Sequence, residues 1–106
     1  MVREINTSDE YNQAVATGKV VVDFYANWCG PCVAIKDFYA GLASSNPEVT
    51  FLKVNVDTAA NKGAMATAGV KCMPTFVFYH DGKQVDKLEG ASKDALNQKV
   101  TSLNNK

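Results

Sequence analysis

The sequence has few cysteines, a single histidine and no excess charge of either sign. Its 106 residues contain three cysteines, and 11 lysines and arginines balance 11 aspartates and glutamates. An odd and small number of cysteines argues against the disulfide framework of a small secreted domain. Balanced charge predicts neither a basic surface for nucleic acid nor an acidic tail. Partners must then be selected by shape and chemistry.

Long hydrophobic segments are also missing from the sequence. No stretch reaches the length of a membrane span, and the opening MVREINTSDE lacks the apolar core of a secretory signal. We therefore expect a cytoplasmic protein that does not enter a membrane. The sequence contains no repeat, low-complexity tract or linker, so residues 1–106 are expected to form one domain, long enough to bury a core without disulfides.

Signals for strands and helices follow each other along the chain. The predicted strands are residues 2–5, 20–26, 49–56, 75–79 and 84–88. The predicted helices begin at a capping box in residues 7–10, near Cys29, at Thr58 and at Ser92, and the first three end near Gly18, Ser44 and Gly69. Asp81-Gly82 is typical of a two-residue hairpin. This order predicts an α/β fold, a mixed sheet of about five strands with about four helices on its two faces.

The chemistry of the chain is expected at Cys29 and Cys32, which are three positions apart in the first turn of a predicted helix. A disulfide could close there without moving the backbone, but it would constrain so little chain that a purely structural role is disfavoured. Zinc needs about four ligands, and only Cys72 and His80 remain as further sulfur or imidazole ligands. No metal site is therefore expected, although spacing alone leaves open a cluster shared between two chains.

A redox role explains the details of this stretch better. The first turn of a helix presents unpaired N–H groups and the positive end of the helix dipole, which favour a thiolate at Cys29. Cys32, one turn further along, is expected to be more buried and less acidic. Cys29 would then attack a target disulfide, and Cys32 would attack the mixed disulfide that forms. Pro31 costs the first turn no hydrogen bond, and Gly30 allows another backbone to approach closely.

Asp23 interrupts an otherwise apolar strand, Val20 to Ala26. Burial should raise the pKa of its carboxyl toward neutrality, where a general base works well. Because the strand ends just before the cysteine helix, Asp23 is expected to lie beneath Cys32 and to accept its proton, directly or through a water. The alternative is an aspartate on an exposed face of the strand.

Together these segments resemble the thioredoxin family. The resemblance rests on the stretches Val22–Ala26, Trp28–Cys32 and Val70–Phe76 and on Gly90. It implies a thioredoxin fold and a protein dithiol–disulfide oxidoreductase that reduces disulfides in target proteins through the Cys29/Cys32 couple. It also implies no bound cofactor, with NADPH used indirectly through a thioredoxin reductase. The implied state is a monomer that Cys72 could link into a dimer on oxidation.

The resemblance further assigns roles to individual residues. It implies a cis peptide bond between Met73 and Pro74 that faces the thiols, in a substrate groove also lined by Trp28, Gly30, Pro31 and Gly90. From the sequence alone, Pro74 could equally be a strand breaker. Lys53 would moderate the titration of Asp23, or else be a solvated strand lysine. Cys72 would be a regulatory thiol on the rim of the groove, or else a small apolar filler.

Two positions depart from the family's pattern and keep other functions open. Val33 stands where a basic residue commonly follows the second cysteine, and Asp37 stands where a proline commonly kinks the helix. A binding clamp whose thiols need not cycle is one alternative, and an isomerase or oxidase with a more oxidising couple is another. The glycine and proline between the thiols favour the reducing members of the superfamily.

Overall fold

The structure is a computed structural model that describes residues 1–70 and 73–106. Its strands are β1 (Val2–Ile5), β2 (Lys19–Tyr25), β3 (Thr50–Asn55), β4 (Thr75–His80) and β5 (Lys83–Glu89). Its helices are α1 (Ser8–Ala14), α2 (Gly30–Ser45), α3 (Lys62–Ala68) and α4 (Lys93–Asn104), with a 3₁₀ turn, η1 (Ala59–Asn61), before α3. The predicted fold is confirmed, and most predicted boundaries hold within one or two residues.

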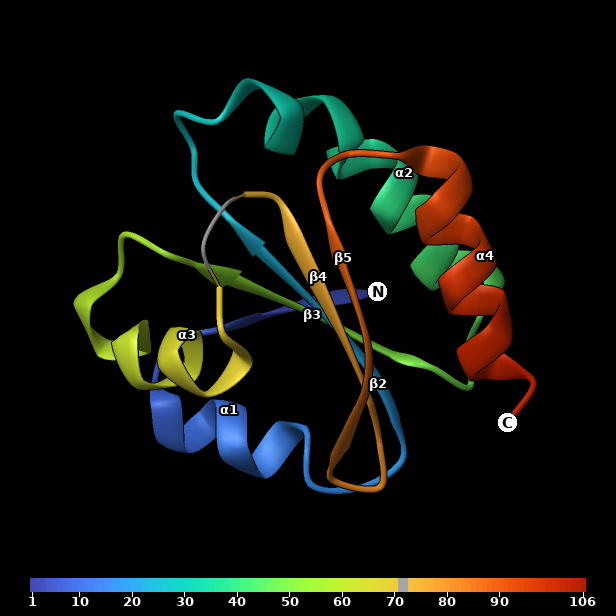
Figure 1. The fold of residues 1–106 in the computed structure, drawn as a ribbon, viewed down its shortest axis with the longest axis horizontal. Coiled ribbons are helices and arrows are strands. Elements are labelled where there is room, and N and C mark those ends of the chain that lie inside the picture. The colour runs from blue at the N-terminus through green and yellow to red at the C-terminus, as the bar shows by residue number, and fades with distance from the viewer. Residues whose placement is uncertain (71–72) are drawn as a thin grey trace.

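The five strands form one mixed sheet in the order β1-β3-β2-β4-β5. β1, β3 and β2 are parallel, and β4 and β5 are antiparallel additions. Figure 1 shows α1 and α3 together on one face of this sheet and α2 and α4 on the other. Since β1, β3 and β2 are parallel, their carboxyl ends meet at one edge of the sheet. The loop that carries the cysteines leaves β2 at this edge.

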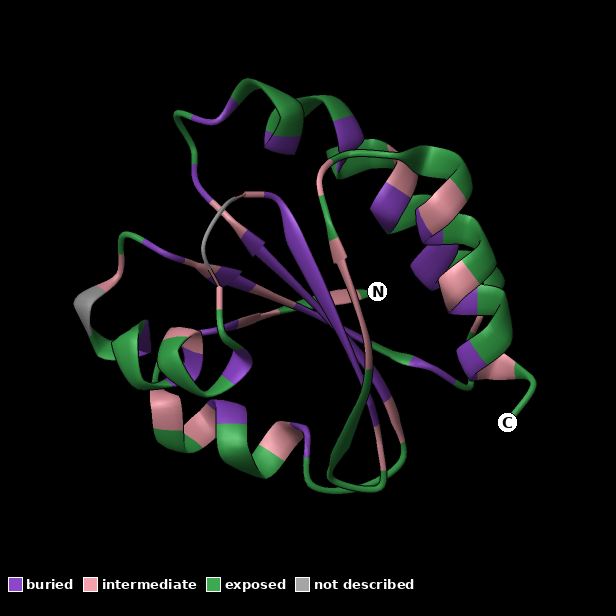
Figure 2. Cartoon of the chain, in the orientation of Figure 1, coloured by how far each residue is buried: buried purple, intermediate pink, exposed green. Residues whose placement is uncertain are grey.

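The core is divided by the sheet into two apolar clusters. Successive residues of β2 point to opposite faces, so Val20, Val22 and Phe24 pack with α1 and α3, whereas Val21 packs with α2 and α4. The first cluster also contains Cys29 and Cys32. Figure 2 shows the central strands buried and the outer sides of the helices exposed. By the same alternation Asp23 points toward α2.

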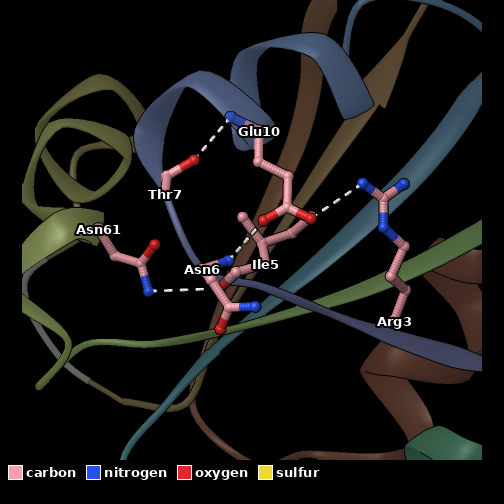
Figure 3. Close-up of polar contacts among 6 residues, drawn as sticks. All are labelled: Arg3, Ile5, Asn6, Thr7, Glu10 and Asn61. Atoms are coloured by element: carbon pink, nitrogen blue, oxygen red, sulfur yellow. Dashed lines mark hydrogen bonds and ion pairs between the residues drawn. The ribbon is translucent and has the colours of Figure 1, made fainter.

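The capping box of α1 forms as predicted, and Glu10 also binds Asn6 and Arg3. Oγ1 of Thr7 accepts a hydrogen bond from the N–H of Glu10 over 3.1 Å. The carboxylate of Glu10 accepts from the N–H of Asn6 over 2.8 Å and also binds Arg3 (Figure 3). The side-chain amide of Asn61 donates to the carbonyl of Ile5 in the same region. The start of α1 is thereby tied to β1 and to the segment before α3.

The predicted end of α1 at Gly18 is wrong, because the helix ends at Ala14. Gly18 serves the following turn instead: its φ is +76°, and its N–H donates to the carboxylate of Asp81 over 2.9 Å. Asp81 and Gly82 form the predicted hairpin turn with φ of +51° and +86°, the signs that a type I′ turn requires. The turn between α1 and β2 is thus bound to the β4–β5 turn through Gly18.

Candidate active site

Cys29 and Cys32 lie where the chain leaves β2 and enters α2. Cys29 is the N-cap residue of α2, and Pro31 is in the first turn of the helix. The N–H of Cys32 donates a hydrogen bond to Sγ of Cys29 over 3.3 Å. Both cysteines are free thiols, with 7% and 5% of their surfaces exposed, so the predicted contrast in burial between them is small. The sulfur of Cys29 occupies the place where helix N–H groups stabilise an anion.

The environment of Cys32 keeps it protonated. Burial raises the pKa of its thiol to about 12, and the neighbouring sulfur of Cys29 and the negative charge of Asp23 act in the same direction. Cys32 is therefore a thiol at neutral pH and needs a base before it can attack.

Asp23 is buried, as predicted, with 6% of its surface exposed. Burial raises the pKa of its carboxyl from the ordinary 3.8 to about 7, and the positive charge of Lys53 opposes that rise. Its Oδ1 has no hydrogen-bond partner among the described residues. A buried carboxyl with a pKa near 7 exchanges a proton at physiological pH. The alternative of an exposed strand face is excluded.

Lys53 lies beside Asp23 because the two residues are register partners in β3 and β2. Its ammonium is 3.7 Å from the carboxylate of Glu4 on β1 and 5.8 Å from the centre of the Tyr25 ring. The Tyr25 hydroxyl donates to the same carboxylate over 2.8 Å. Sequence analysis missed Glu4 and Tyr25, which hold Lys53 in place. They could have been found from the alternation of side chains along each strand, which puts Glu4, Tyr25 and Lys53 on the α2 face of the sheet.

Asp23 and Cys32 line the same cavity, which has a volume of about 220 Å³. The cavity lies between the α2 face of the sheet and α2 itself. Its walls also include Val2, Tyr25, Ala26, Asn27, Val33, Lys36, Tyr39, Ala40 and Lys53. A cavity of this size admits water, so proton exchange between the thiol and the carboxyl has a route. Asp23 and Cys32, which were expected to lie close together, thus face the same cavity.

Trp28 is fixed by a residue that sequence analysis missed, Asp57. The indole ring is 69% exposed, and its Nε1–H donates to the carboxylate of Asp57 over 2.7 Å. Asp57 follows β3, and its N–H donates in turn to the side chain of Asn55 over 2.9 Å. Asp57 could have been predicted from its position just after a parallel strand, because it then lies at the sheet edge where β2 also ends. An exposed aromatic ring held this way forms a rigid contact surface.

The peptide bond between Met73 and Pro74 is cis, as the resemblance implied. The carbonyl of Pro74 accepts a hydrogen bond from the N–H of Gly90 over 2.9 Å, and Gly90 has a φ of +103° that favours glycine. Among residues 1–70 and 73–106, no atom outside the immediate neighbours lies within 4 Å of a Cβ built at Gly30 or Gly90, so these residues leave both positions open on that side. Cys72 lies outside the described residues.

The two departures from the family's pattern both lie on α2. Val33 is 61% exposed and also forms part of the cavity wall. Asp37 is exposed within a helix that runs unbroken for 16 residues. Tyr39, on the buried side of α2, donates to the carbonyls of Val21 and Leu52 and so binds the helix to the sheet. The helix is anchored behind the thiols without the missing proline.

The described part of the chain offers neither a metal site nor a membrane-spanning helix. Among residues 1–70 and 73–106, no three His, Cys, Asp or Glu side chains are grouped as a metal site would require. None of the described helices has the length and apolar character needed to cross a bilayer.

Comparison with known proteins gives a consistent result. The Thioredoxin family model matches residues 2–102. Thioredoxin H-type 2 of Nicotiana tabacum is 46% identical over 101 residues, which cover 91% of this chain and 84% of the tobacco protein. Thioredoxin of Gallus gallus is 43% identical over 107 residues, which cover 97% of this chain and 99% of the chicken protein.

Solved structures agree with the sequence relatives. The X-ray structure of Fasciola hepatica thioredoxin has a TM-score of 0.88 and 42% identity, and covers 94% of this chain and 97% of that one. The crystal structure of Malassezia sympodialis thioredoxin has a TM-score of 0.90 and 32% identity, and covers 97% and 93% of the two chains.

Proposed function

Because this chain belongs to the thioredoxin family, we propose that its described residues divide the family's reaction among them as follows. The chain is a thiol–disulfide oxidoreductase, and the Cys29/Cys32 pair reduces disulfides in target proteins. It carries no prosthetic group, since the redox-active disulfide is part of the chain. The proposal concerns which residue performs each step, where targets bind and how the pair is reset.

Cys29 begins the reaction as the nucleophile. Its thiolate attacks one sulfur of the target disulfide, a mixed disulfide forms, and the other target sulfur leaves as a thiolate. The hydrogen bond from the N–H of Cys32 to the sulfur of Cys29 supports this role, because it places that sulfur at the N-terminus of α2, where unpaired backbone N–H groups point outward. This contact is the observation that carries the proposal.

Cys32 completes the reaction with Asp23 as its base. The carboxylate accepts the thiol proton across the shared cavity, and the resulting thiolate of Cys32 attacks Cys29. A disulfide forms between the two cysteines, and the second target sulfur leaves. The target has gained two electrons, and this chain has lost them. The raised pKa values of Cys32 and Asp23 support the assignment. The Cys32 thiol holds its proton at neutral pH, whereas a carboxyl with a pKa of about 7 is partly ionised there and can accept a proton.

Targets are proposed to bind across the surface around Cys29. Trp28, fixed by Asp57, would contact one side of an extended target segment, and the backbone of Met73 beside cis-Pro74 would pair with it as an added strand. Gly30, Pro31 and Gly90 would complete the groove, because the open space at the two glycines admits another backbone. Lys53 would act on the reaction through the charge it places beside Asp23.

The oxidised pair is proposed to be reset by a thioredoxin reductase that takes electrons from NADPH. The protein would act as a monomer in the cytoplasm. Cys72 would link two chains into a dimer on oxidation. One relative among solved structures, at 30% identity and a TM-score of 0.89, comes from work on thiol resolution in a yeast mitochondrial 1-Cys peroxiredoxin. A peroxiredoxin is therefore the first target protein to test.

Turnover with a protein disulfide tests the assignment. With dithiothreitol as the electron source, catalytic amounts of the wild type should accelerate the precipitation of insulin, and Cys29→Ser should abolish the acceleration. Cys32→Ser should accumulate a mixed disulfide that mass spectrometry detects. A Cys32→Ser variant that turns over like the wild type would disprove the resolving role. A folded, reducible wild type without acceleration would instead favour a specialised or binding function.

A further inference from the structure

The cavity behind Cys32 has more room than proton transfer requires. Its volume of about 220 Å³ exceeds the roughly 150 Å³ in which an engineered apolar cavity binds benzene. Its floor carries Asp23, whose Oδ1 is buried and has no partner among the described residues. Most of the remaining wall is apolar or aromatic, from Val2, Val33, Tyr39 and Ala40. An apolar body with one polar group fits such a space.

A hydroxyl is the polar group best suited to bind Asp23. The pKa of Asp23 is about 7 because of burial, so protonated and ionised forms coexist at neutral pH. A hydroxyl donates to the carboxylate and accepts from the protonated form, so it can bind both. A carboxylate ligand would bind only the protonated form. A hydroxyl that replaces a water in the cavity also keeps the water's hydrogen bond.

An aromatic ring is the apolar group best suited to pack against the cavity walls. Tyr39 and Tyr25 provide aromatic surface within the cavity, and the wall also includes Lys36 and Lys53. Aromatic rings pack favourably on one another, and ammonium groups are attracted to their faces. A cationic ligand, by contrast, would meet the repulsion of both lysines. The ring would fill the cavity while its hydroxyl reaches Asp23.

We propose that this cavity is a binding site for small phenolic compounds, with the phenol hydroxyl on Asp23 and the ring between the sheet and α2. The ligand would occupy the space that Asp23 and Cys32 share and would separate the base from the resolving thiol. Bound ligand would thereby slow the second half of the disulfide exchange. The site lies on the α2 face of the sheet, in the cavity behind the thiols, so it is distinct from the proposed target groove.

Binding can be measured on the reduced protein without any turnover, so its failure is separate from failure of the proposed function. Titration of ¹⁵N-labelled protein with phenol should give saturable shifts at the amides of Asn27, Val33 and Ala40. Seven non-hydrogen atoms in a site of this kind predict a dissociation constant of about 1 mM. Toluene, which lacks the hydroxyl, should bind about tenfold more weakly, the loss expected for one hydrogen bond.

Two variants of α2 distinguish the cavity from the general surface. Ala40→Leu extends a side chain into the cavity and should abolish the shifts, whereas Ala34→Leu, on the same helix outside the cavity wall, should leave them unchanged. The amide spectrum itself reports whether each variant folds. Should Ala40→Leu fail to fold, nuclear Overhauser contacts between the phenol ring and the methyl groups of Val33 and Ala40 in the wild type provide the same test.

The results that would overturn the proposal are equally specific. Shifts that do not saturate, or that persist in a folded Ala40→Leu variant, would show that phenol does not occupy this cavity. Toluene binding as tightly as phenol would refute the hydrogen bond to Asp23. Absence of the ring-to-methyl contacts at a phenol concentration that saturates the shifts would place the ligand elsewhere.

Discussion

Replacing Asp23 by asparagine should make the protein more stable, and by an amount that depends on pH. The side chain is buried, and its folded pKa is about 7 against an ordinary value of 3.8. At about 1.4 kcal/mol per pKa unit, that difference corresponds to roughly 4 kcal/mol. This is the free energy that the ionised carboxyl costs the folded state. An asparagine at this position carries no charge, so the variant avoids that cost.

The sign follows from the protons that each state binds. Below about pH 3.8 both states are protonated, and Asp23 costs nothing. Between about pH 3.8 and pH 7 the folded protein keeps a proton that the unfolded chain releases, so stability decreases as the pH rises. Above pH 7 the whole cost is present. Asparagine does not ionise, so the difference in unfolding free energy between variant and wild type should grow across this window.

Urea unfolding of the reduced proteins, followed by circular dichroism from pH 4 to pH 9, measures this difference. Its value at pH 9 should exceed its value at pH 4 by about 4 kcal/mol, and the buried amide adds a contribution that does not depend on pH. Asp37→Asn, an exposed position on α2, is the matched control and should show no such change with pH. A flat difference for Asp23→Asn would refute the raised pKa and, with it, the assignment of Asp23 as the base.

Three further predictions concern the stability of the fold. Thr7→Ala removes the side-chain cap of α1 and should lower the unfolding free energy by about 1 kcal/mol in urea. Tyr11→Phe leaves the buried hydroxyl of Tyr79 without its 2.6 Å partner and should lower the unfolding free energy by about 1–3 kcal/mol. The double variant with Tyr79→Phe should recover part of this loss, because no buried hydroxyl is then left unpaired. Additive losses in that cycle would contradict the pairing. Gly82→Ala should lower the melting temperature, since its φ is +86° and a Cβ would lie 3.1 Å from a backbone oxygen, whereas Gly41→Ala, in the open interior of α2, should raise it slightly.

The fold was predictable because its signals are local. The alternation of strands and helices, the capping box at Thr7 and the Asp81-Gly82 turn each act within a few residues, and all are present in the structure. The end of α1 was not predictable from Gly18, because that glycine serves a contact with Asp81, 63 positions away. Local pattern does not report such a partner.

The reacting residues of the candidate site could be predicted from the sequence, whereas most of the residues that position them could not. Cys29, Cys32 and Asp23 were found because a thiol pair and a buried carboxyl are unusual in sequence as well as in space. Asp57 was missed because an aspartate after a strand is ordinary, and only the fold brings it to the indole of Trp28. The cavity could not be foreseen either, since its walls come from β1, β2, β3 and α2.

The division of the core has a consequence for how such a protein can change over time. The two thiols pack with the cluster beneath α1 and α3, whereas Asp23 points to the side of α2 and α4, where Cys32 also lines its cavity. Substitutions in the first layer act mainly on the position of the sulfurs, and substitutions in the second act mainly on the base and its cavity. Cys32 belongs to both layers, so a change at this residue affects the position of the sulfur and the release of its proton together. Selection, or an engineer, can adjust one of these properties mainly through residues other than Cys32.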